Sequence, residues 1–467
     1  MTTDNIQPLI YKSTRGRAKE LYFKDVIFEG LASDGGLYIP SVWPKLDNNL
    51  ITEFKNMSYQ DIAFHIFKPY IDTSISDDKL KEIIFESYSK FTNDEITPLN
   101  KIEEKEYLLE LFHGPTLAFK DIAMQVIGNL YDYLEVAKDK TVNVVVATSG
   151  DTGSAAIAAL SNRKNINLFV LHPHNKISNI QRKIMTTIGG ANIYNIAIEG
   201  SFDDCQKIVK QLFNEDSFRS KINMSGVNSI NWARIVCQIV YYFYSFFRLK
   251  KNSISFSVPT GNFGDIYAGY VAKKMGLPIN KLIVATNKND ILQRVINTGE
   301  YKPDTVKATI TPSMDIQVAS NFERLLYYIL DESDSKVGSL MNDLSSKSLF
   351  NLEKKEIDRI KKDFEAVKVT DEETVSIIDE IYKEHKFIID PHTATGVGAA
   401  KSFKNLGDIV VLGTAHPYKF NDTIKKAIGK NLDSPEHLKL NIDKKETFDI
   451  IRNSNSEVKN YILGKIQ

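Results

Sequence analysis

The stretch VNVVVATSGDTGSAAIAAL (residues 142–160) reads as an apolar strand, a small polar loop and an alanine-rich helix. Ser149, Thr152 and the neighbouring glycines would place backbone amides and hydroxyls at the start of that helix. Such a helix start is a natural binding site for a carboxylate or a phosphate. A tight turn with an ordinary serine or threonine cap also explains these residues. Asp151 fits an anion site poorly, unless its side chain turns away or contacts a donor.

The same alternation of strand, loop and helix runs through the middle of the chain. Short apolar runs rich in Val, Ile and Phe alternate with longer helical stretches. Strands are expected at 107–112, 142–148, 166–173, 192–198, 253–260 and 281–286. Helices are expected at about 118–137, 153–162, 176–188, 201–213, 230–249 and 264–275. This pattern predicts an α/β fold with doubly wound, mostly parallel sheets, in which ligands bind beyond the carboxyl ends of the strands.

The segments on either side of this regular core are different in character. The N-terminal part mixes helix and turn, with glycine and proline in GLASDGGLYIP (30–40). Charged helices such as NLEKKEIDRIKKDFEAVKV (351–369) dominate after the core, and strand-like sequence returns in KFIIDPHTATG (386–396) and DIVVLGTAHP (408–417). We therefore predict an N-terminal domain at 1–95, an α/β catalytic core at 96–300, a helical insertion at 301–386, and completion of the core with C-terminal helices at 387–467.

Composition argues against several classes of function. Of 467 residues 42% are hydrophobic, and 59 Lys and Arg balance 59 Asp and Glu, so no global field favours nucleic acid or anionic lipid. Cys205 and Cys237 lack the spacing of a zinc or redox site and suit a reducing compartment. The apolar run IVCQIVYYFYSFF (235–247) is shorter than the roughly 20 residues of a membrane span, which predicts a buried core helix. Because no signal or transit peptide is evident at the N-terminus, we expect a cytoplasmic protein without nucleic-acid or membrane partners.

The segment HGPTLAFKD (113–121) places Lys120 where a loop becomes a helix. The positive end of the helix dipole disfavours a charged lysine at this position. Burial beside Phe119 would lower the pKa of the amine further and leave a neutral group able to form an imine with an aldehyde. The alternative is a lysine whose stem lies on the protein while its charge reaches solvent.

A second strand, loop and helix occur in ISFSVPTGNFGDIYAGYVAKKMGLP (254–278). Gly261 and Gly264 permit close backbone approach, and the amides from Asn262 to Asp265 can converge on a phosphate. The loop is neither a Walker loop nor a dinucleotide fingerprint. An ordinary glycine turn remains the alternative.

Seven motifs, spread over almost the whole chain, can be compared with known families as a set. They are TRG (14–16), GLASDGGLYIP, HGPTLAFKD, TSGDTGSAA, NSINWARI (228–235), PTGNFGD and GTAHPYKF (413–420). Together they resemble the fold type II, tryptophan-synthase-like group of pyridoxal-phosphate enzymes. Within that group the set is most similar to the threonine synthase family, in its longer bacterial and fungal branch.

The resemblance implies roles for individual residues. Lys120 would bind pyridoxal 5'-phosphate covalently, and Thr414 would contact the pyridine nitrogen of the cofactor. A neutral hydroxyl there, in place of a carboxylate, would leave that nitrogen unprotonated and favour elimination over transamination. The phosphate of the cofactor would be held by the GNFGD loop, which consists of Gly261, Asn262, Phe263, Gly264 and Asp265.

The implied reaction converts O-phospho-L-homoserine and water into L-threonine and inorganic phosphate. Lys120, once freed by the substrate amine, would act as the base at the α- and β-carbons. Ser149 and Thr152 suit the substrate carboxylate. The substrate phosphate carries about −1.5 to −2 charges and needs a second cationic site, although each basic candidate could instead form a structural ion pair or lie at the surface. The candidates are Asn231, Arg234, Lys12 and Arg15.

Other readings remain open on the sequence alone. His113, His392 and His416 could shuttle protons, but neutral, hydrogen-bonded structural roles are expected because Lys120 already supplies a base. No metal constellation is expected. A serine or threonine dehydratase of the same fold would release ammonia and a keto acid, and a catalytically silent homologue would only bind phosphorylated ligands. Lys120 argues against the silent homologue, and analogy of fold suggests a monomer or homodimer.

Overall fold

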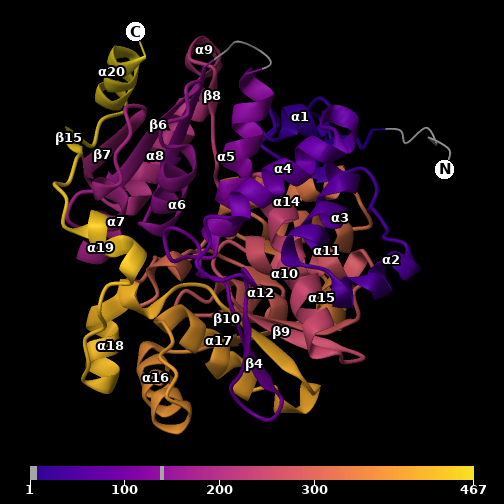
Figure 1. Ribbon diagram of the computed structural model, residues 1–467. Coiled ribbons are helices and arrows are strands. Elements are labelled where there is room, and N and C mark those ends of the chain that lie inside the picture. Colours follow the sequence, from indigo (N-terminus) through magenta and orange to yellow (C-terminus); the bar gives the residue numbers. More distant parts are fainter. Residues whose placement is uncertain (1–7, 137–140, 467) are drawn as a thin grey trace.

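Two β-sheets with helices packed around them organise the computed structural model, which describes residues 8–136 and 141–466 (Figure 1). The larger sheet consists of β3 (Leu99–Lys101), β4 (Glu106–Glu110), β9 (Ile254–Pro259), β10 (Ile279–Thr286), β13 (Phe364–Lys368) and β14 (Ile409–Gly413). Their order in the sheet is β13-β10-β9-β14-β4-β3, and all neighbours are parallel except β3 and β4.

The smaller sheet has only parallel neighbours. It consists of β5 (Val142–Ala147), β6 (Ile166–Pro173), β7 (Ile193–Glu199), β8 (Met224–Ser225) and β15 (Asp449–Arg452). Their order is β15-β7-β6-β5-β8. Two short antiparallel pairs are separate from both sheets: β1 (Tyr11–Ser13) with β2 (Tyr38–Pro40), and β11 (Glu300–Tyr301) with β12 (Phe350–Asn351). The mostly parallel sheets confirm the predicted α/β fold class.

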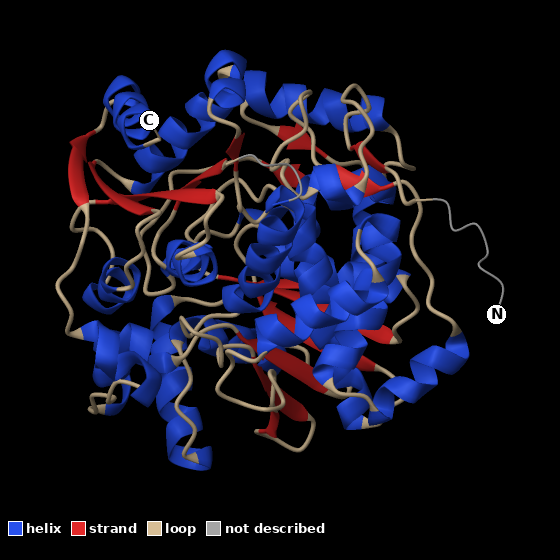
Figure 2. Cartoon of the chain, turned by 45° about the horizontal axis from the view of Figure 1, so that its top comes forward, coloured by secondary structure: helices blue, strands red, loops and turns tan. Residues whose placement is uncertain are grey.

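The expected core strands are confirmed to within two residues at each end. Every residue of β9 is buried, and β5 is buried except at Ala147, which is half-buried. Strands of parallel sheets are covered on both faces by helices and therefore read as continuous apolar runs. Figure 2 shows this arrangement, with helices on both sides of the strands.

The expected core helices are also present. They are α5 (Lys120–Val136), α6 (Asp151–Leu160), α7 (Asn179–Thr187), α8 (Phe202–Asn214), α10 (Trp232–Leu249) and α11 (Gly264–Lys274). The expected end of the first helix, residue 137, lies outside the described residues. Residues 232–246 of α10 are all buried, as predicted for a core helix. Among the described residues, no helix is long and apolar enough to cross a membrane.

The remaining helices flank this core. The N-terminal part contributes α1 (Phe23–Val26), α2 (Asn48–Glu53), α3 (Tyr59–Ile71) and α4 (Asp77–Tyr88). The others are α9 (Asp216–Lys221), α12 (Ile291–Thr298), α13 (Phe322–Ile329), α14 (Asp334–Lys347), α15 (Lys354–Asp363), α16 (Asp371–His385), α17 (Pro391–Lys401), α18 (Asn421–Ile428), α19 (Glu436–Ile442) and α20 (Asn455–Lys465). Helix α3 packs against α10, and α4 against α5. The four domain limits given above stay a prediction.

Two local expectations were wrong. The charged segment 351–369 is not helical throughout, because its last part forms β13, which pairs with β10 at the edge of the larger sheet. The segment 386–396 contains no strand; Asp390 instead caps α17, with its carboxylate accepting from the amides of His392 and Thr393. The apolar residues before Asp390 pack as loop into the core under α16 and α17.

Candidate active site

The GNFGD loop joins the carboxyl end of β9 to the start of α11. Phe263 has a φ of 68°, in the left-handed region that a bulky residue seldom adopts. Its buried ring packs between Phe322 and Phe364, with centroid distances of 5.3 and 5.5 Å. The carbonyl of Asn262 accepts from the amide of Asn321 at 3.0 Å. These contacts hold the loop in one shape.

The backbone amides of this loop are left without protein acceptors. Within residues 8–136 and 141–466, the N–H groups of Gly261, Asn262 and Phe263 donate to no protein atom. A methyl group on Gly261 would meet the carbonyl oxygen of Ser313 at 2.9 Å, so only glycine lets the two segments approach this closely. A run of free donors at a helix start is the geometry that binds phosphate.

One cavity collects side chains from segments far apart in the sequence. The predicted residues that line it are Lys120, the loop 261–265 and Thr414. The structure adds eight residues to this lining: Phe119, Asp151, Pro259, Thr260, Ser313, Met314, His392 and Ala415. Their meeting point lies at the carboxyl ends of β9 and β14, where parallel sheets bind ligands.

Lys120 is the first residue of α5 and is almost fully buried. Its Nζ lies 3.3 Å from Oδ2 of Asp151 and 4.8 Å from the centroid of the Phe119 ring. Burial lowers the pKa of the amine and outweighs the opposing effect of Asp151, while the positive charges of Lys419 and Arg234 lower it further. The amine is therefore biased toward its neutral, nucleophilic form, in the direction expected from the sequence.

Asp151 joins two buried lysines. Its Oδ1 lies 2.6 Å from Nζ of Lys419, whose side chain is 0% exposed and also donates to the carbonyl of Thr116 at 3.0 Å. Gln181 donates to the same carboxylate at 2.9 Å. Lys419 and Lys120 hold the pKa of Asp151 well below its usual range despite its burial. The carboxylate thus contacts donors, which removes the difficulty that its sequence position raised.

Thr414 follows β14 directly and is tied to the lysine segment. Its carbonyl accepts from the amide of Phe119 at 2.9 Å, and Ala118 forms a bridge with Ala415. Thr414 is buried and lines the cavity together with Lys120. The end of β14 therefore fixes the position of α5 relative to the GNFGD loop.

The loop before α6 is capped by a residue that the sequence analysis did not single out. The hydroxyl of Thr148 accepts from the amides of Gly150 and Gly153, both at 2.9 Å. Ser149 and Thr152 are half-buried beside it and do not belong to the lining of the cavity. Thr148 therefore accepts from the amides at the start of α6. The hydroxyls of Ser149 and Thr152 are not needed for this role.

Asn231 and Arg234 lie at the start of α10, and neither lines the cavity. The side chain of Asn231 caps that helix through the amide of Ala233 at 3.0 Å and donates to the carbonyl of Ile27 at 2.6 Å. Arg234 is buried, and its Nε has no partner among the described residues. Burial lowers its pKa to about 10. The side chain of Asn231 is thus occupied by structural hydrogen bonds. The Nε–H of Arg234 has no acceptor among the described residues.

The N-terminal candidates are engaged in ion pairs. Arg15 binds Glu323 through two parallel hydrogen bonds of 3.0 and 2.9 Å. Lys12 lies 3.8 Å from Glu332 and over the ring of Tyr327. Neither residue lines the cavity.

Asp265 is the last residue of the GNFGD loop and connects it to α10. Its Oδ1 accepts from the hydroxyls of Tyr241 and Tyr242, and its Oδ2 is buried without a partner among the described residues. Burial raises its pKa to about 6. The carboxyl anchors the start of α11 on α10.

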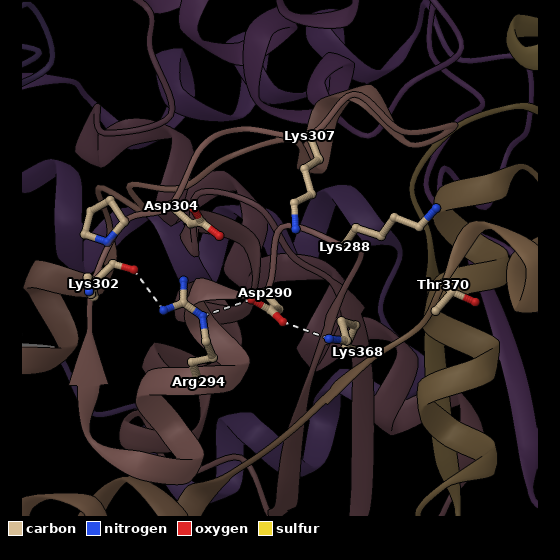
Figure 3. A pocket seen from close by; sticks show the side chains of 9 residues that line it. Lys288, Asp290, Arg294, Lys302, Asp304, Lys307, Lys368 and Thr370 are labelled. Atoms are coloured by element: carbon tan, nitrogen blue, oxygen red, sulfur yellow. Dashed lines mark hydrogen bonds and ion pairs between the residues drawn. The ribbon is translucent and has the colours of Figure 1, made fainter.

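A second cavity, of about 510 Å³, lies where β10 and β13 end (Figure 3). Its charges are largely paired: Asp290 binds Arg294 at 2.9 Å and Lys368 at 3.0 Å, and Lys288 binds Asp371 at 3.1 Å. None of the sequence-predicted site residues lines it. An ion-pair network at the protein surface accounts for these groups.

Comparison with known proteins agrees with this geometry. The family model described as "Threonine synthase N terminus" matches residues 10–88, "Pyridoxal-phosphate dependent enzyme" matches 93–414, and "Threonine synthase, C-terminal" matches 393–462. A threonine synthase of Pseudomonas aeruginosa is 44% identical, with 97% of each chain covered. The chain belongs to the threonine synthase family.

Solved structures of this family share the whole fold. A pyridoxal-phosphate-bound threonine synthase from Brucella melitensis superposes with a TM-score of 0.94 at 42% identity, covering 98% of this chain and 99% of that one. The yeast threonine synthase gives 0.91 at 41% identity, covering 98% of each. The family's cofactor fits the cavity, because a buried amine with lowered pKa faces a loop with three free amides.

Gly261→Ala tests this fit. The added methyl must push the loop away from Ser313, a displacement that costs about 1–3 kcal/mol in well-packed sites. We expect cofactor affinity to fall roughly 5- to 150-fold, measured by absorbance titration of the apoenzyme. The matched control is Gly338→Ala, because a methyl at this helical position meets nothing within 4 Å. An unchanged affinity in Gly261→Ala would mean that the loop does not hold the cofactor.

Proposed function

We propose that this chain converts O-phospho-L-homoserine and water into L-threonine and inorganic phosphate, as a pyridoxal-phosphate-dependent threonine synthase. The observation that carries the proposal is the single cavity lined by Lys120, the loop 261–265 and Thr414. Membership of the threonine synthase family, with matches along nearly the whole chain, supports the same reaction.

Three elements of the cavity would hold the cofactor. Lys120 would bind it through Nζ, the free amides of 261–263 would bind its phosphate, and Thr414 would face its pyridine nitrogen. When bound, pyridoxal phosphate supplies an electron sink for charge that develops on the substrate carbons.

Lys120 would also move protons. Its buried amine is biased toward the neutral form and can take a proton from carbon. Asp151 then lies 3.3 Å away to stabilise the ammonium that results, and Lys419 keeps this carboxylate charged. The lysine can therefore accept and return a proton without contact with solvent.

Substrate groups would bind around this centre. We propose Ser149 and Thr152 for the carboxylate, because Thr148 already performs the capping task. For the substrate phosphate, Arg234 is favoured over the other sequence candidates by its unpaired Nε. Arg15 would first have to leave Glu323, Asn231 is committed to its helix cap, and Lys12 is held by Glu332.

Thr414→Asp tests the control of reaction type. A carboxylate at this position would protonate the pyridine nitrogen and strengthen the electron sink, which favours side reactions. We expect the ratio of keto acid to threonine to rise about tenfold, equivalent to about 1.4 kcal/mol between the competing barriers. Thr414→Ser keeps the hydroxyl and should leave the ratio unchanged. An unchanged ratio in Thr414→Asp would contradict the role given to Thr414.

A paired assay tests the function itself. Purified protein with pyridoxal phosphate and O-phospho-L-homoserine is followed for inorganic phosphate, threonine and keto acid in one time course. Equal release of phosphate and threonine is expected. Phosphate with keto acid would instead indicate elimination without productive water addition, which is the behaviour of a dehydratase. No turnover at all would favour the silent homologue.

We propose a cytoplasmic location and no nucleic-acid partner. Zero net charge gives no field that attracts polyanions, and both cysteines are free and buried. A monomer or homodimer is proposed from the fold alone.

A further inference from the structure

His392 differs from the other histidines near the cavity. It is the second residue of α17, is only 3% exposed, and lines the same cavity as Lys120 and the GNFGD loop. His113 is paired with Glu110 at 2.7 Å, and Nδ1 of His416 accepts from the amide of Tyr418 at 3.2 Å. Neither of these two belongs to the cavity lining.

The ring of His392 is positioned by contacts with Asp390 and Phe420. Its Nδ1 lies 2.9 Å from Oδ1 of Asp390, and its edge packs on Phe420 with a centroid distance of 4.8 Å. Asp390 is itself fixed, because it caps α17 through the amides of His392 and Thr393. Nε2 is buried and has no partner among the described residues. His392 thus lines the cavity with a ring that is held at Nδ1 and has no protein partner at Nε2 among the described residues.

The proposed reaction requires an acid at the leaving oxygen. A phosphate monoester already carries about −1.5 to −2 charges near neutrality. Breaking the bond between the γ-carbon and oxygen without a proton would place one further negative charge on the departing group. Lys120 cannot supply that proton while it takes one from the β-carbon in the same elimination.

We propose that His392 is a catalytic residue that gives its Nε2 proton to the bridging oxygen as phosphate leaves, and then accepts a proton from the water that adds to the β-carbon. The inference rests on the proposed function. Asp390 holds the Nδ1 proton throughout and stabilises the imidazolium, as an acid beside a catalytic imidazole does elsewhere.

Atoms and electrons balance in this sequence. The electron pair of the β-carbon–hydrogen bond forms the double bond to the γ-carbon, and the pair of the γ-carbon–oxygen bond leaves with phosphate. Lys120 carries the β-proton to the γ-carbon, so the number of carbon-bound hydrogens does not change. Water contributes its oxygen to the β-carbon and one proton to Nε2, which replaces the proton that phosphate carried away.

The test compares two leaving groups in the holoenzyme. O-phospho-L-homoserine needs a proton on its leaving oxygen, whereas 2-amino-4-bromobutanoate loses bromide without one. In His392→Asn the amide still reaches Asp390 but Nε2 is gone. We expect kcat/KM for phosphate release to fall about 10²- to 10⁴-fold, the usual contribution of a positioned acid, with a much smaller loss for bromide release. His392→Gln, which places an amide near the Nε2 position, should give the same pattern.

Two readouts separate chemistry from structure. Circular dichroism and the cofactor absorbance titration should match those of the wild type for both variants. His172→Gln removes an equally buried histidine in β6, outside the cavity, and should leave the ratio of the two rates unchanged. In the unmodified enzyme, phosphate release should slow in heavy water more than bromide release does.

Several outcomes would overturn the proposal. Equal losses for both substrates, no loss in either variant, or equal heavy-water effects would each exclude His392 as the acid. Failure of the proposed function looks different, because the wild type itself would then release no phosphate and threonine from O-phospho-L-homoserine.

Discussion

Lys120→Ala is expected to abolish threonine formation, with a loss of at least about 10⁴-fold, because one amine would both hold the cofactor and move the protons on carbon. The fold should survive, since the side chain contributes no apolar core and its charge partner Asp151 keeps Lys419. The absorbance of covalently held cofactor should disappear, while circular dichroism stays unchanged. Threonine and phosphate are measured in the same preparation.

Lys90→Ala is the matched control for this variant. Desolvation lowers the pKa of Lys90 as well, but this lysine lies outside the cavity and binds Gln125. Its removal should leave cofactor absorbance and turnover as they are. If Lys120→Ala kept the absorbance of covalently held cofactor, another amine would have to be the attachment point.

Lys419→Met is expected to have the largest effect on stability. It breaks a fully buried ion pair and leaves the Asp151 carboxylate with Gln181 and a more distant Lys120. Removing one partner of such a pair costs about 3–5 kcal/mol, because the remaining charge stays buried. The change is read from chemical denaturation monitored by circular dichroism.

A double-mutant cycle shows whether the cost comes from the stranded carboxylate. Lys419→Met combined with Asp151→Asn should recover part of the free energy of unfolding, since the buried carboxylate that lost Lys419 is then neutral. Lys383→Met serves as control, because its pair with Asp379 is largely solvent-exposed and contributes about 1 kcal/mol at most. A small loss in Lys419→Met, comparable to that of the control, would contradict the assigned pair.

The elements of the fold could be predicted from the sequence where burial alone determines the pattern of apolar residues. The core strands are covered on both faces, so their apolar runs marked them to within two residues. The strand β13 was missed because it lies at the edge of the sheet: Phe364 and Ala366 are buried, while Glu365 between them and Lys368 at the end carry charge. The short run before Asp390 is apolar because it packs in the core, which requires no strand.

The sequence predicted those parts of the site that lie within one continuous segment, but not the contacts between distant segments. Glycine spacing and helix starts marked the loop 261–265 and Lys120, because these properties are local. Lys419 could not be assigned, since its meaning depends on Asp151, more than 250 positions earlier in the chain. His392 was expected to be structural because its motif does not show that the fold places the ring in the cavity lining and leaves Nε2 without a partner among the described residues.

The place of β14 in the larger sheet bears on how the enzyme is made. This strand lies between β9 and β4 and ends beside Thr414, yet it is synthesised roughly 150 residues after β9, a delay of about 8–30 s at the usual pace of translation. Until then β9 and β4 have no common neighbour, and Thr414 is missing from the cavity that Lys120 lines. A chain whose synthesis stops before β14 therefore exposes the edges of β9 and β4 and lacks part of the cavity lining.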